Sequence, residues 1–225
     1  MKQIAIIHTS FVSLNDLKAF CAEIIPDVKV WNIVDDSLLP EVIAAGHLTA
    51  GVTRRVCAYA VEAQSLGVDF ILNQCSSVGE AVDVARRMLD IPYLKIDEPM
   101  AREAVRLGSK ISVIATVPTT LGPSSRLVES AAREAKKTVE VKQVLCEGAF
   151  DVLVREGNKE KHNAMVLDRI KTEEKTADVI VLAQGSMLAL LPYLSEFKKP
   201  VLTSPRLGIE GVRSAIDGHG NGSRR

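Results

Sequence analysis

The sequence has no excess of charge of either sign and no basic run. Its 28 Lys and Arg residues balance 28 Asp and Glu residues, so nothing attracts a nucleic acid or an anionic membrane surface. No apolar run approaches the length of a bilayer span, and the apolar residues 4–7 are too few for the core of a signal peptide. We therefore expect no nucleic-acid partner, no membrane partner and a cytoplasmic location.

Motifs that hold metals or nucleotides are also absent. The four cysteines show no CxxC or Cys/His metal spacing, no pair of His or carboxylate residues has metal spacing, and neither a Walker A loop nor a GxGxxG motif follows any apolar run. A chain of 225 residues with 47% apolar residues can bury a core without disulfides. We expect reduced thiols, no metal and no cofactor.

Short apolar, β-branched runs alternate with longer segments of helical period. We predict strands at residues 4–7, 28–31, 70–72, 93–96, 111–115, 139–144, 179–182 and 201–202. Helices are predicted at residues 14–25, 52–66, 78–89, 100–107, 126–136, 149–156 and 163–175, with Gly67 and Gly108 as helix stops. This alternation is typical of parallel βαβ units. Residues 217–225, rich in Gly, Ser and Arg, are predicted to be a frayed tail.

The second half of the chain repeats the first with a period of roughly 108 residues. Residues 4–9 resemble 111–116, and 69–72 resemble 178–181. The predicted fold is therefore α/β, with two pseudo-symmetric lobes that each contain a parallel sheet flanked by helices. Residues 1–97 with 206–225 form the first lobe, and 98–205 form the second. Because ligands bind at the carboxyl ends of parallel strands, we expect the site in the cleft between the lobes.

Small polar residues follow four of the predicted strands. They are His8, Thr9, Ser10, Gln74, Cys75, Ser76 and Ser77 in the first half and Thr116, Thr119, Gln184, Gly185 and Ser186 in the second. Ser77 and Glu80 fit a capping box that would start a helix just after Cys75. The helix dipole and its free N–H groups would then favour a thiolate and bind a substrate carboxylate.

Most of these residues also have an ordinary structural interpretation. Free cysteines are usually core residues, and Cys21, Cys57 and Cys146 lie within apolar patterns. Ser and Thr at strand ends are common helix caps, and His47 and His162 lie on helical segments, where a surface position is the more frequent one. Cys75 differs because polar residues surround it at a turn, so it is the candidate catalytic residue.

Four segments together resemble the aspartate/glutamate/hydantoin racemase superfamily. They are residues 71–77 (ILNQCSS), 91–99 (IPYLKIDEP), 111–116 (ISVIAT) with Thr119, and 179–187 (VIVLAQGSM). The resemblance implies two lobes around the substrate, a cysteine from each lobe and no cofactor. By position, Cys75 matches the first cysteine, and the residues that match the carboxylate-binding positions are Ser76, Ser77, Thr116, Thr119 and Ser186. From their strand-end positions we add Thr9, Ser10, Gln184 and Gly185 as substrate-binding candidates.

The chain departs from the family pattern at two positions. Gln184 occupies the position of the second cysteine, and a glutamine amide cannot serve as the second base that a racemase needs. The acidic residue that follows the first strand in glutamate racemases is also missing, because this chain has His8, Thr9 and Ser10 there. His8 could stand in as a proton relay.

The sequence thus predicts a cofactor-independent racemase-superfamily enzyme that transfers a proton at the carbon next to a carboxylate. Cys75 would be the acid or base, and Gln184 a hydrogen-bond donor. One alternative keeps the site but makes it a single-cysteine decarboxylase or cis–trans isomerase of a small carboxylic acid. The other is a catalytically inactive protein that binds a small acid. The expected partner is a small carboxylate, and the sequence leaves open whether copies of the chain form a homo-oligomer.

Overall fold

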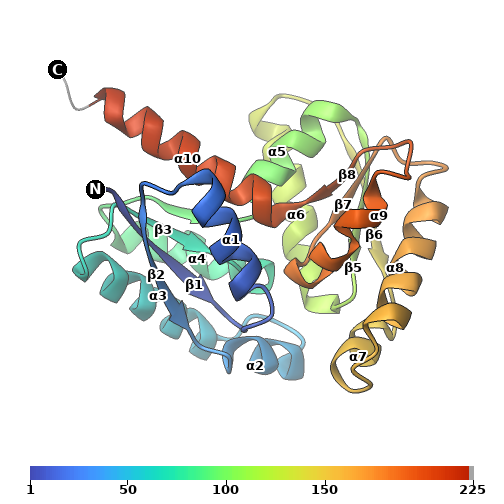
Figure 1. Ribbon diagram of the computed structural model, residues 1–225, viewed down its shortest axis with the longest axis horizontal. Coiled ribbons are helices and arrows are strands. Elements are labelled where there is room, and N and C mark those ends of the chain that lie inside the picture. The colour runs from blue at the N-terminus through green and yellow to red at the C-terminus, as the bar shows by residue number, and fades with distance from the viewer. Residues whose placement is uncertain (223–225) are drawn as a thin grey trace. The chain divides into compact units, whose positions relative to one another are not determined.

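The computed structural model describes residues 1–222, and their side chains as far as residue 218. The chain divides into two compact units, one of Met1–Ile96 together with the segment from Pro205 onward, the other of Asp97–Ser204. Each unit contains a four-stranded parallel sheet flanked by helices (Figure 1). The predicted α/β class with two parallel sheets is confirmed.

The first unit is built on the strands β1 (Gln3–His8), β2 (Lys29–Val34), β3 (Phe70–Asn73) and β4 (Tyr93–Lys95), which pair in the order β2-β1-β3-β4. Its helices are α1 (Leu14–Ile24), α2 (Leu38–Ala45), α3 (Ala50–Ser65), α4 (Gly79–Ala85) and α10 (Ser204–Gly222), with 3₁₀ turns η1 (Ser76–Val78) and η2 (Arg86–Met88). The chain passes to one side of β1 to form β2 and to the other side to form β3. The switch point therefore lies between β1 and β3, where ligands bind in sheets of this kind.

The second unit repeats this topology. Its strands β5 (Lys110–Ala115), β6 (Glu140–Leu145), β7 (Val179–Leu182) and β8 (Val201–Thr203) pair in the order β6-β5-β7-β8. Its helices are α5 (Glu98–Leu107), α6 (Pro118–Glu134), α7 (Ala149–Val154), α8 (Lys159–Glu173) and α9 (Leu191–Leu194), with the 3₁₀ segment η3 (Gly185–Leu190). Over the described part of the chain, no helix combines the length and the apolar character needed to cross a bilayer.

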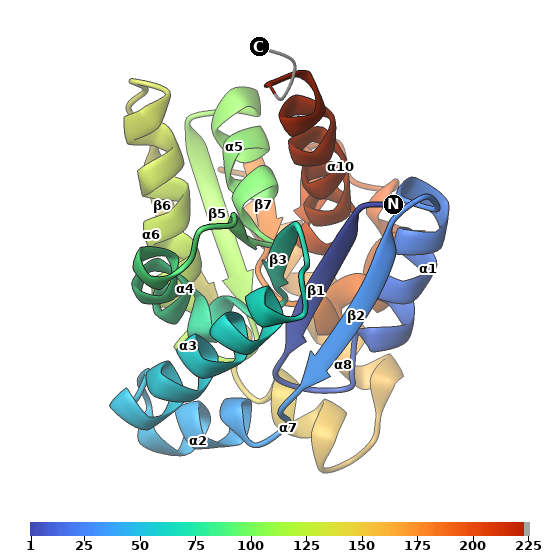
Figure 2. The same ribbon diagram turned by 90° about the vertical axis from the view of Figure 1, so that its left-hand side faces the viewer.

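The core of the first unit lies on both faces of its sheet. Ala5 and Ile7 of β1 pack with α3 and α4 on one face, and Ile4 and Ile6 pack with α1 and α10 on the other. Figure 2 shows α1 and α3 on opposite sides of this sheet. Side chains alternate between the faces of a strand, and both faces are covered, which is why β1 is apolar throughout.

In the second unit the described core packs α8 against the sheet. Ile114 of β5 and Ile180 and Leu182 of β7 are fully buried with Val166 and Ile170 of α8. Burying an aliphatic side chain of this size contributes about 1.5–3 kcal/mol. These contacts hold β5 and β7 side by side, so their carboxyl ends have a fixed position.

All eight predicted strands are present, but three helices, α2, α9 and α10, were not predicted, and a fourth, α6, begins early. α6 begins at Pro118, eight residues before the predicted start at residue 126, and includes Pro123. Pro118 suits the first helical position, whereas a proline in the sixth position normally opposes a helix. Burial of Thr120, Leu121 and Ser124 along the same helix outweighs that cost.

Gly67 and Gly108 both follow helices, as predicted, but for different reasons. Gly67 has φ +76°, the left-handed conformation that favours glycine after a helix. Gly108 is extended, with φ −163° and ψ 178°. A Cβ at this position would lie 2.4 Å from Cβ of Asp178. Close approach of a neighbour therefore requires glycine at residue 108.

The predicted frayed tail from residue 217 is wrong for residues 217–222, because α10 continues to Gly222; residues 223–225 lie outside the described residues. The helix buries Ile209, Val212 and Ile216 in the first unit. Arg213 also pairs with Asp217 on the same helix (2.6 Å). An apolar stripe at helical spacing therefore stabilises a segment whose composition suggests a tail.

Gly208 allows α10 to lie close to the end of β4, and its replacement should destabilise the first unit. A Cβ there would lie 2.4 Å from Cγ1 of Ile96 and 2.7 Å from its carbonyl oxygen. We expect Gly208→Ala to lower the free energy of unfolding by about 1–3 kcal/mol through overpacking. The matched control is Gly218→Ala on the same helix, where no atom lies within 4 Å of the new Cβ.

Gly218→Ala should raise the free energy of unfolding by about 0.5–1 kcal/mol, since alanine is the better helix former. Urea unfolding of both variants and of the wild-type protein measures these changes in the free energy of unfolding. Equal effects of the two substitutions would show that α10 does not pack against Ile96 as described.

Candidate active site

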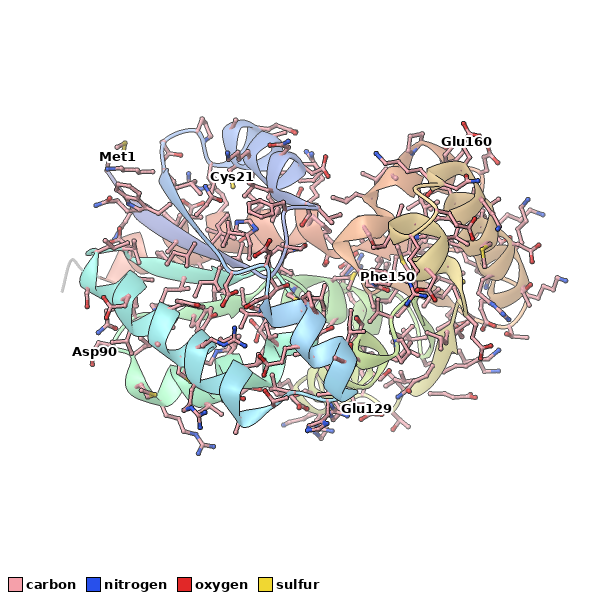
Figure 3. All side chains as sticks on the ribbon, turned by 90° about the horizontal axis from the view of Figure 1, so that it is seen from below. Met1, Cys21, Asp90, Glu129, Phe150 and Glu160 are labelled. Carbon is pink, nitrogen blue, oxygen red and sulfur yellow. The ribbon has the colours of Figure 1, made fainter. Side chains whose placement is uncertain are left out.

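Cys75 lies immediately after β3, where the chain turns into η1. It has extended backbone, with φ −118° and ψ 119°. Nδ2 of Asn73, the last residue of β3, donates a hydrogen bond to the Cys75 carbonyl oxygen (2.7 Å) and fixes this peptide. Cys75 is partly exposed, whereas Cys21, Cys57 and Cys146 are buried, as predicted for structural thiols. Figure 3 labels Cys21 on α1.

Hydrogen-bond donors from two chain segments surround the Cys75 sulfur. Thr9 contributes its hydroxyl from the end of β1, and η1 contributes the N–H groups of Ser77 and Val78 and the Ser77 hydroxyl. Burial raises the pKa of the Cys75 thiol, and these donors lower it but do not cancel the larger effect of burial. The thiol is therefore neutral at neutral pH.

The predicted low-pKa thiolate at Cys75 is wrong, and the start of the next helix explains why. α4 begins at Gly79, with Val78 as its N-cap residue and no side chain capping it. Ser77 of the predicted capping box lies in η1, one residue before the N-cap of α4. The three residues of η1 separate Cys75 from α4, and the favourable effect of a helix dipole falls off within one turn. Burial therefore decides the direction of the pKa shift.

Gln184 lies two residues after the end of β7, where the chain turns into η3. It has extended backbone, with φ −141° and ψ 140°. Its Oε1 accepts hydrogen bonds from Thr116 N, from Thr116 Oγ1 (3.1 Å) and from Val117 N (3.2 Å). Only a carbonyl oxygen can accept from three donors, so the orientation of the amide is fixed. The NH₂ group of Gln184 is left as the donor that a ligand could use.

Cys75 and Gln184 occupy equivalent places in the two units. Each residue follows the third strand of its sheet and caps a 3₁₀ turn. Each side chain accepts a hydrogen bond from a threonine at the end of the first strand, Thr9 for Cys75 and Thr116 for Gln184. The internal repeat therefore extends to the hydrogen bonds of the candidate site.

The remaining candidates lie in the same strand-end segments: Ser10, Ser76 and Ser77 in the first unit, and Thr119, Gly185 and Ser186 in the second. Ser186 Oγ is buried and has no hydrogen-bond partner among the described atoms. Among the side chains of residues 1–218, no group of three from His, Cys, Asp or Glu is placed to hold a metal ion. The candidates of each unit thus follow the carboxyl ends of that unit's own strands. The facing of Cys75 and Gln184 across a cleft stays a prediction.

The sequence matches the Asp/Glu/Hydantoin racemase family over residues 7–212, a span that includes both strand-end positions. The chain belongs to the Asp/Glu/hydantoin racemase family. The resemblance inferred from the four sequence segments is therefore confirmed. No curated protein matches the sequence.

Solved structures of racemases share the fold of this family member. Allantoin racemase from Klebsiella pneumoniae has a TM-score of 0.74 and 16% identity, covering 97% of this chain and 89% of its own. A glutamate racemase isoform from Bacillus anthracis has a TM-score of 0.73 and 17% identity, covering 97% and 83%. Aspartate racemase from Picrophilus torridus has a TM-score of 0.70 and 14% identity, covering 96% and 95%. At these identities the similarity concerns the fold.

His8, the sequence candidate for a proton relay in this racemase-family protein, is fully buried at the end of β1. Its Nε2 is 2.9 Å from Asn32 Oδ1, and no hydrogen bond to Cys75 is present among the described residues. Burial lowers the pKa of His8, although the Asn32 contact partly opposes this. Thr9, and not His8, is the residue of this segment that contacts the thiol.

The other two histidines on predicted helical segments differ from each other. His47 is exposed in the loop after α2, where its Nδ1 contacts the carbonyl oxygen of Ala45 (2.9 Å). His162 on α8 is fully buried, so the expected surface position is wrong for this residue. It lies one turn before the buried Val166, on the core face of α8.

A polar network after β2 was not predicted from the sequence. Asp35 accepts hydrogen bonds from the Tyr59 hydroxyl (2.7 Å), from Arg55 Nη1 (3.3 Å) and from the N–H of Ser37 (3.0 Å). Burial alone would raise the pKa of Asp35, but these hydrogen bonds and the Arg55 charge together lower it. The only signal in the sequence is the Asp35-Asp36-Ser37 run after a strand. This acidic side chain is engaged by its neighbours and not by Cys75.

Alkylation can test the description of Cys75. Iodoacetamide should modify Cys75 before the other three thiols, because those are buried and burial also raises their pKa values, that of Cys21 to about 11. Since the thiolate is the nucleophile and burial raises the pKa of Cys75, its labelling rate should rise with pH around a midpoint at higher pH than that of free cysteine. Mass spectrometry after limited labelling measures both effects.

A midpoint of Cys75 labelling at lower pH than that of free cysteine would mean that the donors outweigh burial in setting the pKa of this thiol. First labelling at Cys21, Cys57 or Cys146 would contradict the assignment of the reactive thiol itself.

Proposed function

We propose that this racemase-family chain is a cofactor-independent isomerase that transfers a proton at the carbon next to the carboxylate of a small acid. Cys75 is its acid or base. The observation that carries the proposal is the partly exposed Cys75 thiol, which lies at a strand end and is surrounded by hydrogen-bond donors. Family membership supports the reaction type, and no nucleic acid or membrane takes part.

Cys75 has two charge states to use in this function. In the neutral state it delivers its proton to the planar, enolate-like intermediate, and the sulfur becomes a thiolate. Thr9 and the N–H groups of Ser77 and Val78 are donors that stabilise this thiolate. In the reverse direction the thiolate removes the proton from carbon, the C–H electron pair moves into the enolate, and the neutral thiol is restored.

The substrate carboxylate and the developing enolate charge need fixed donors. Ser10, Ser76 and Ser77 provide hydroxyl groups in the first unit, and Thr119 and Ser186 do so in the second. The Ser186 hydroxyl is the best supported of these, because a buried hydroxyl without a partner is costly unless a ligand satisfies it. Thr116 has a different role here, since its N–H and hydroxyl groups already donate to Gln184.

Gln184 gives the second face of the substrate a donor instead of a base. Its Oε1 is held by Thr116 and Val117, so the amide hydrogens are the groups that can reach an intermediate. A neutral amide neither removes nor delivers a proton at neutral pH. Proton transfer is therefore confined to the face of Cys75. This favours one second candidate function on the same site, namely decarboxylation with protonation on a single face.

Isotope exchange distinguishes one-face from two-face chemistry. In D₂O the wild-type protein should place deuterium on only one face of its product, and racemisation of free amino acids should be very slow. Gln184→Cys should raise the racemisation rate about 100-fold or more, since a second positioned acid or base typically contributes that much. Chiral chromatography and NMR on a panel of small carboxylates measure both quantities.

The double variant Cys75→Ser with Gln184→Cys is the control, because activity gained through two thiols must disappear when one is removed. Cys75→Ser alone should abolish turnover and leave the thermal unfolding midpoint nearly unchanged. Efficient racemisation by the wild-type protein would overturn the single-base mechanism. If Cys75→Ser failed to fold, Cys75 would have a structural role instead of a catalytic one.

A further inference from the structure

Helix α1 and the edge strand β2 of the first unit, both labelled in Figure 2, border a groove of about 250 Å³. Side chains of a strand alternate between its two faces, so Val30 and Asn32 point to the same side of β2. Along α1, Lys18, Ala22 and the C-cap residue Ile25 are spaced by four and three residues and share one face. These two faces line the groove, which we name the α1–β2 groove.

The α1–β2 groove is polar at one end and apolar at the other. β1 and β2 run parallel, so the helix that connects them runs in the opposite direction, and its beginning lies beside the end of β2. This arrangement places Lys18 with Asn32 at the polar end. Ile25 lies with Val28 at the apolar end, where the Val28 N–H donates to the Ile25 carbonyl oxygen (3.0 Å). Cys21 adds an uncharged wall, because burial raises the pKa of its thiol to about 11.

The Lys18 ammonium at the polar end makes no hydrogen bond or ion pair within the described part of the chain. The acidic residues that follow it, Glu23 and Asp27, are each paired with an arginine of α10. Asp16 precedes Lys18 by two residues and therefore lies on a different side of α1. The positive charge of Lys18 is thus available to an anion in the groove.

Asn32 adds a directed hydrogen-bond donor beside this cation. Nε2 of His8 donates to Asn32 Oδ1 (2.9 Å), which fixes the amide and leaves its NH₂ group for a ligand. Burial lowers the pKa of His8, the Asn32 hydrogen bond opposes this effect, and the charge of Lys18 lowers the pKa further. The Lys18 charge therefore lies close enough to this pair to act on it. One end of the groove combines a cation with an amide donor.

The α1–β2 groove is separate from the candidate active site. Cys21 and Val28, which line the groove, belong to the core on the face of the first sheet where α1 packs. Cys75 packs against the core on the other face, with α3 and α4. A ligand in the groove can therefore bind without contact with the Cys75 thiol.

We propose that the α1–β2 groove binds a small aliphatic monocarboxylate. Lys18 Nζ and the Asn32 NH₂ group hold the carboxylate, as donors of hydrogen bonds to an ionised acceptor. The alkyl chain lies against Ala22, Ile25 and Val28. The volume of about 250 Å³ is below the range of about 300–1,000 Å³ for drug-sized ligands, so the chain has only a few carbon atoms. This site goes beyond the proposed function, because its ligand is bound and not converted.

NMR titration of the backbone amides of the wild-type protein tests the site directly. The probes are acetate, butanoate, pentanoate and pentylamine, which vary chain length and then the sign of the charge. Amides of residues 18–32 should shift with the carboxylates, and binding should tighten about fourfold for each methylene group that the groove buries. Pentylamine should bind there more weakly than pentanoate. Amides of residues 74–77 and 116–119 report binding at the candidate active site separately.

Variants assign the two ends of the groove. Lys18→Gln should weaken pentanoate binding about tenfold or more, as for loss of a hydrogen bond to a charged group, and Lys18→Arg should restore most of it. Lys29→Gln is the matched control and should have no effect, because the Lys29 ammonium lies over the Trp31 ring (4.0 Å from its centroid) and not in the groove. Ala22→Leu fills the groove and should remove the gain from each methylene group.

Three results would each overturn the inference: no amide shift in residues 18–32 with any probe, pentylamine bound there as tightly as pentanoate, or equal effects of Lys18→Gln and Lys29→Gln. The first two use the wild-type protein and do not depend on the folding of a variant. Cys75→Ser should leave binding in the groove unchanged. Loss of proton exchange in that variant concerns the proposed function alone.

Discussion

The pairing of two neighbouring parallel strands in each sheet determines the whole candidate site. β1 runs beside β3, and β5 runs beside β7. Parallel neighbours end at the same edge of a sheet, so residues far apart in the sequence meet there. This pairing brings Thr9 to Cys75 in one unit and Thr116 to Gln184 in the other.

The core fixes the register of these strands and so the position of the site. In β1, Ile4 and Ile6 fill one face and Ala5 and Ile7 the other. A slip by one residue would exchange the two faces and expose or overpack both layers. The same slip would also move Thr9 away from the Cys75 sulfur. Packing energy within the unit is thus what holds the hydrogen-bond donors of the thiol in place.

The strands β1, β3, β5 and β7 could be predicted because burial makes each of them a short apolar run, and the internal repeat gave the same order of elements in both halves of the chain. α10 could not be predicted from composition, because its stability comes from the packing of Ile209, Val212 and Ile216. The early start of α6 was hidden by Pro123 for the same reason. In both helices, tertiary contacts outweigh the local conformational preference of the sequence.

Within the site, the sequence was sufficient to single out Cys75 but not to give its charge state. The prediction relied on a helix dipole, whereas the pKa depends on burial and on donors that come from Thr9 and η1. The orientation of the Gln184 amide could not be predicted either, because the N–H groups of Thr116 and Val117 determine it. Side-chain identity can be read from a sequence, but hydrogen-bond partners across a sheet edge require the fold.

Gln184 occupies the position in the second unit that Cys75 occupies in the first, and it preserves the structure of the repeat. In the proposed function this replacement changes the chemistry. A thiolate sulfur and an amide oxygen both accept the hydrogen bond of a strand-end threonine, so either residue fits the same turn. In the proposed function, the neutral Cys75 thiol and the Gln184 amide are two proton-bearing groups, and neither is a base at rest. In the proposed function such a site protonates an electron-rich carbon more readily than it removes a proton from one. This charge state is the physical reason to keep decarboxylation with one-face protonation beside proton exchange.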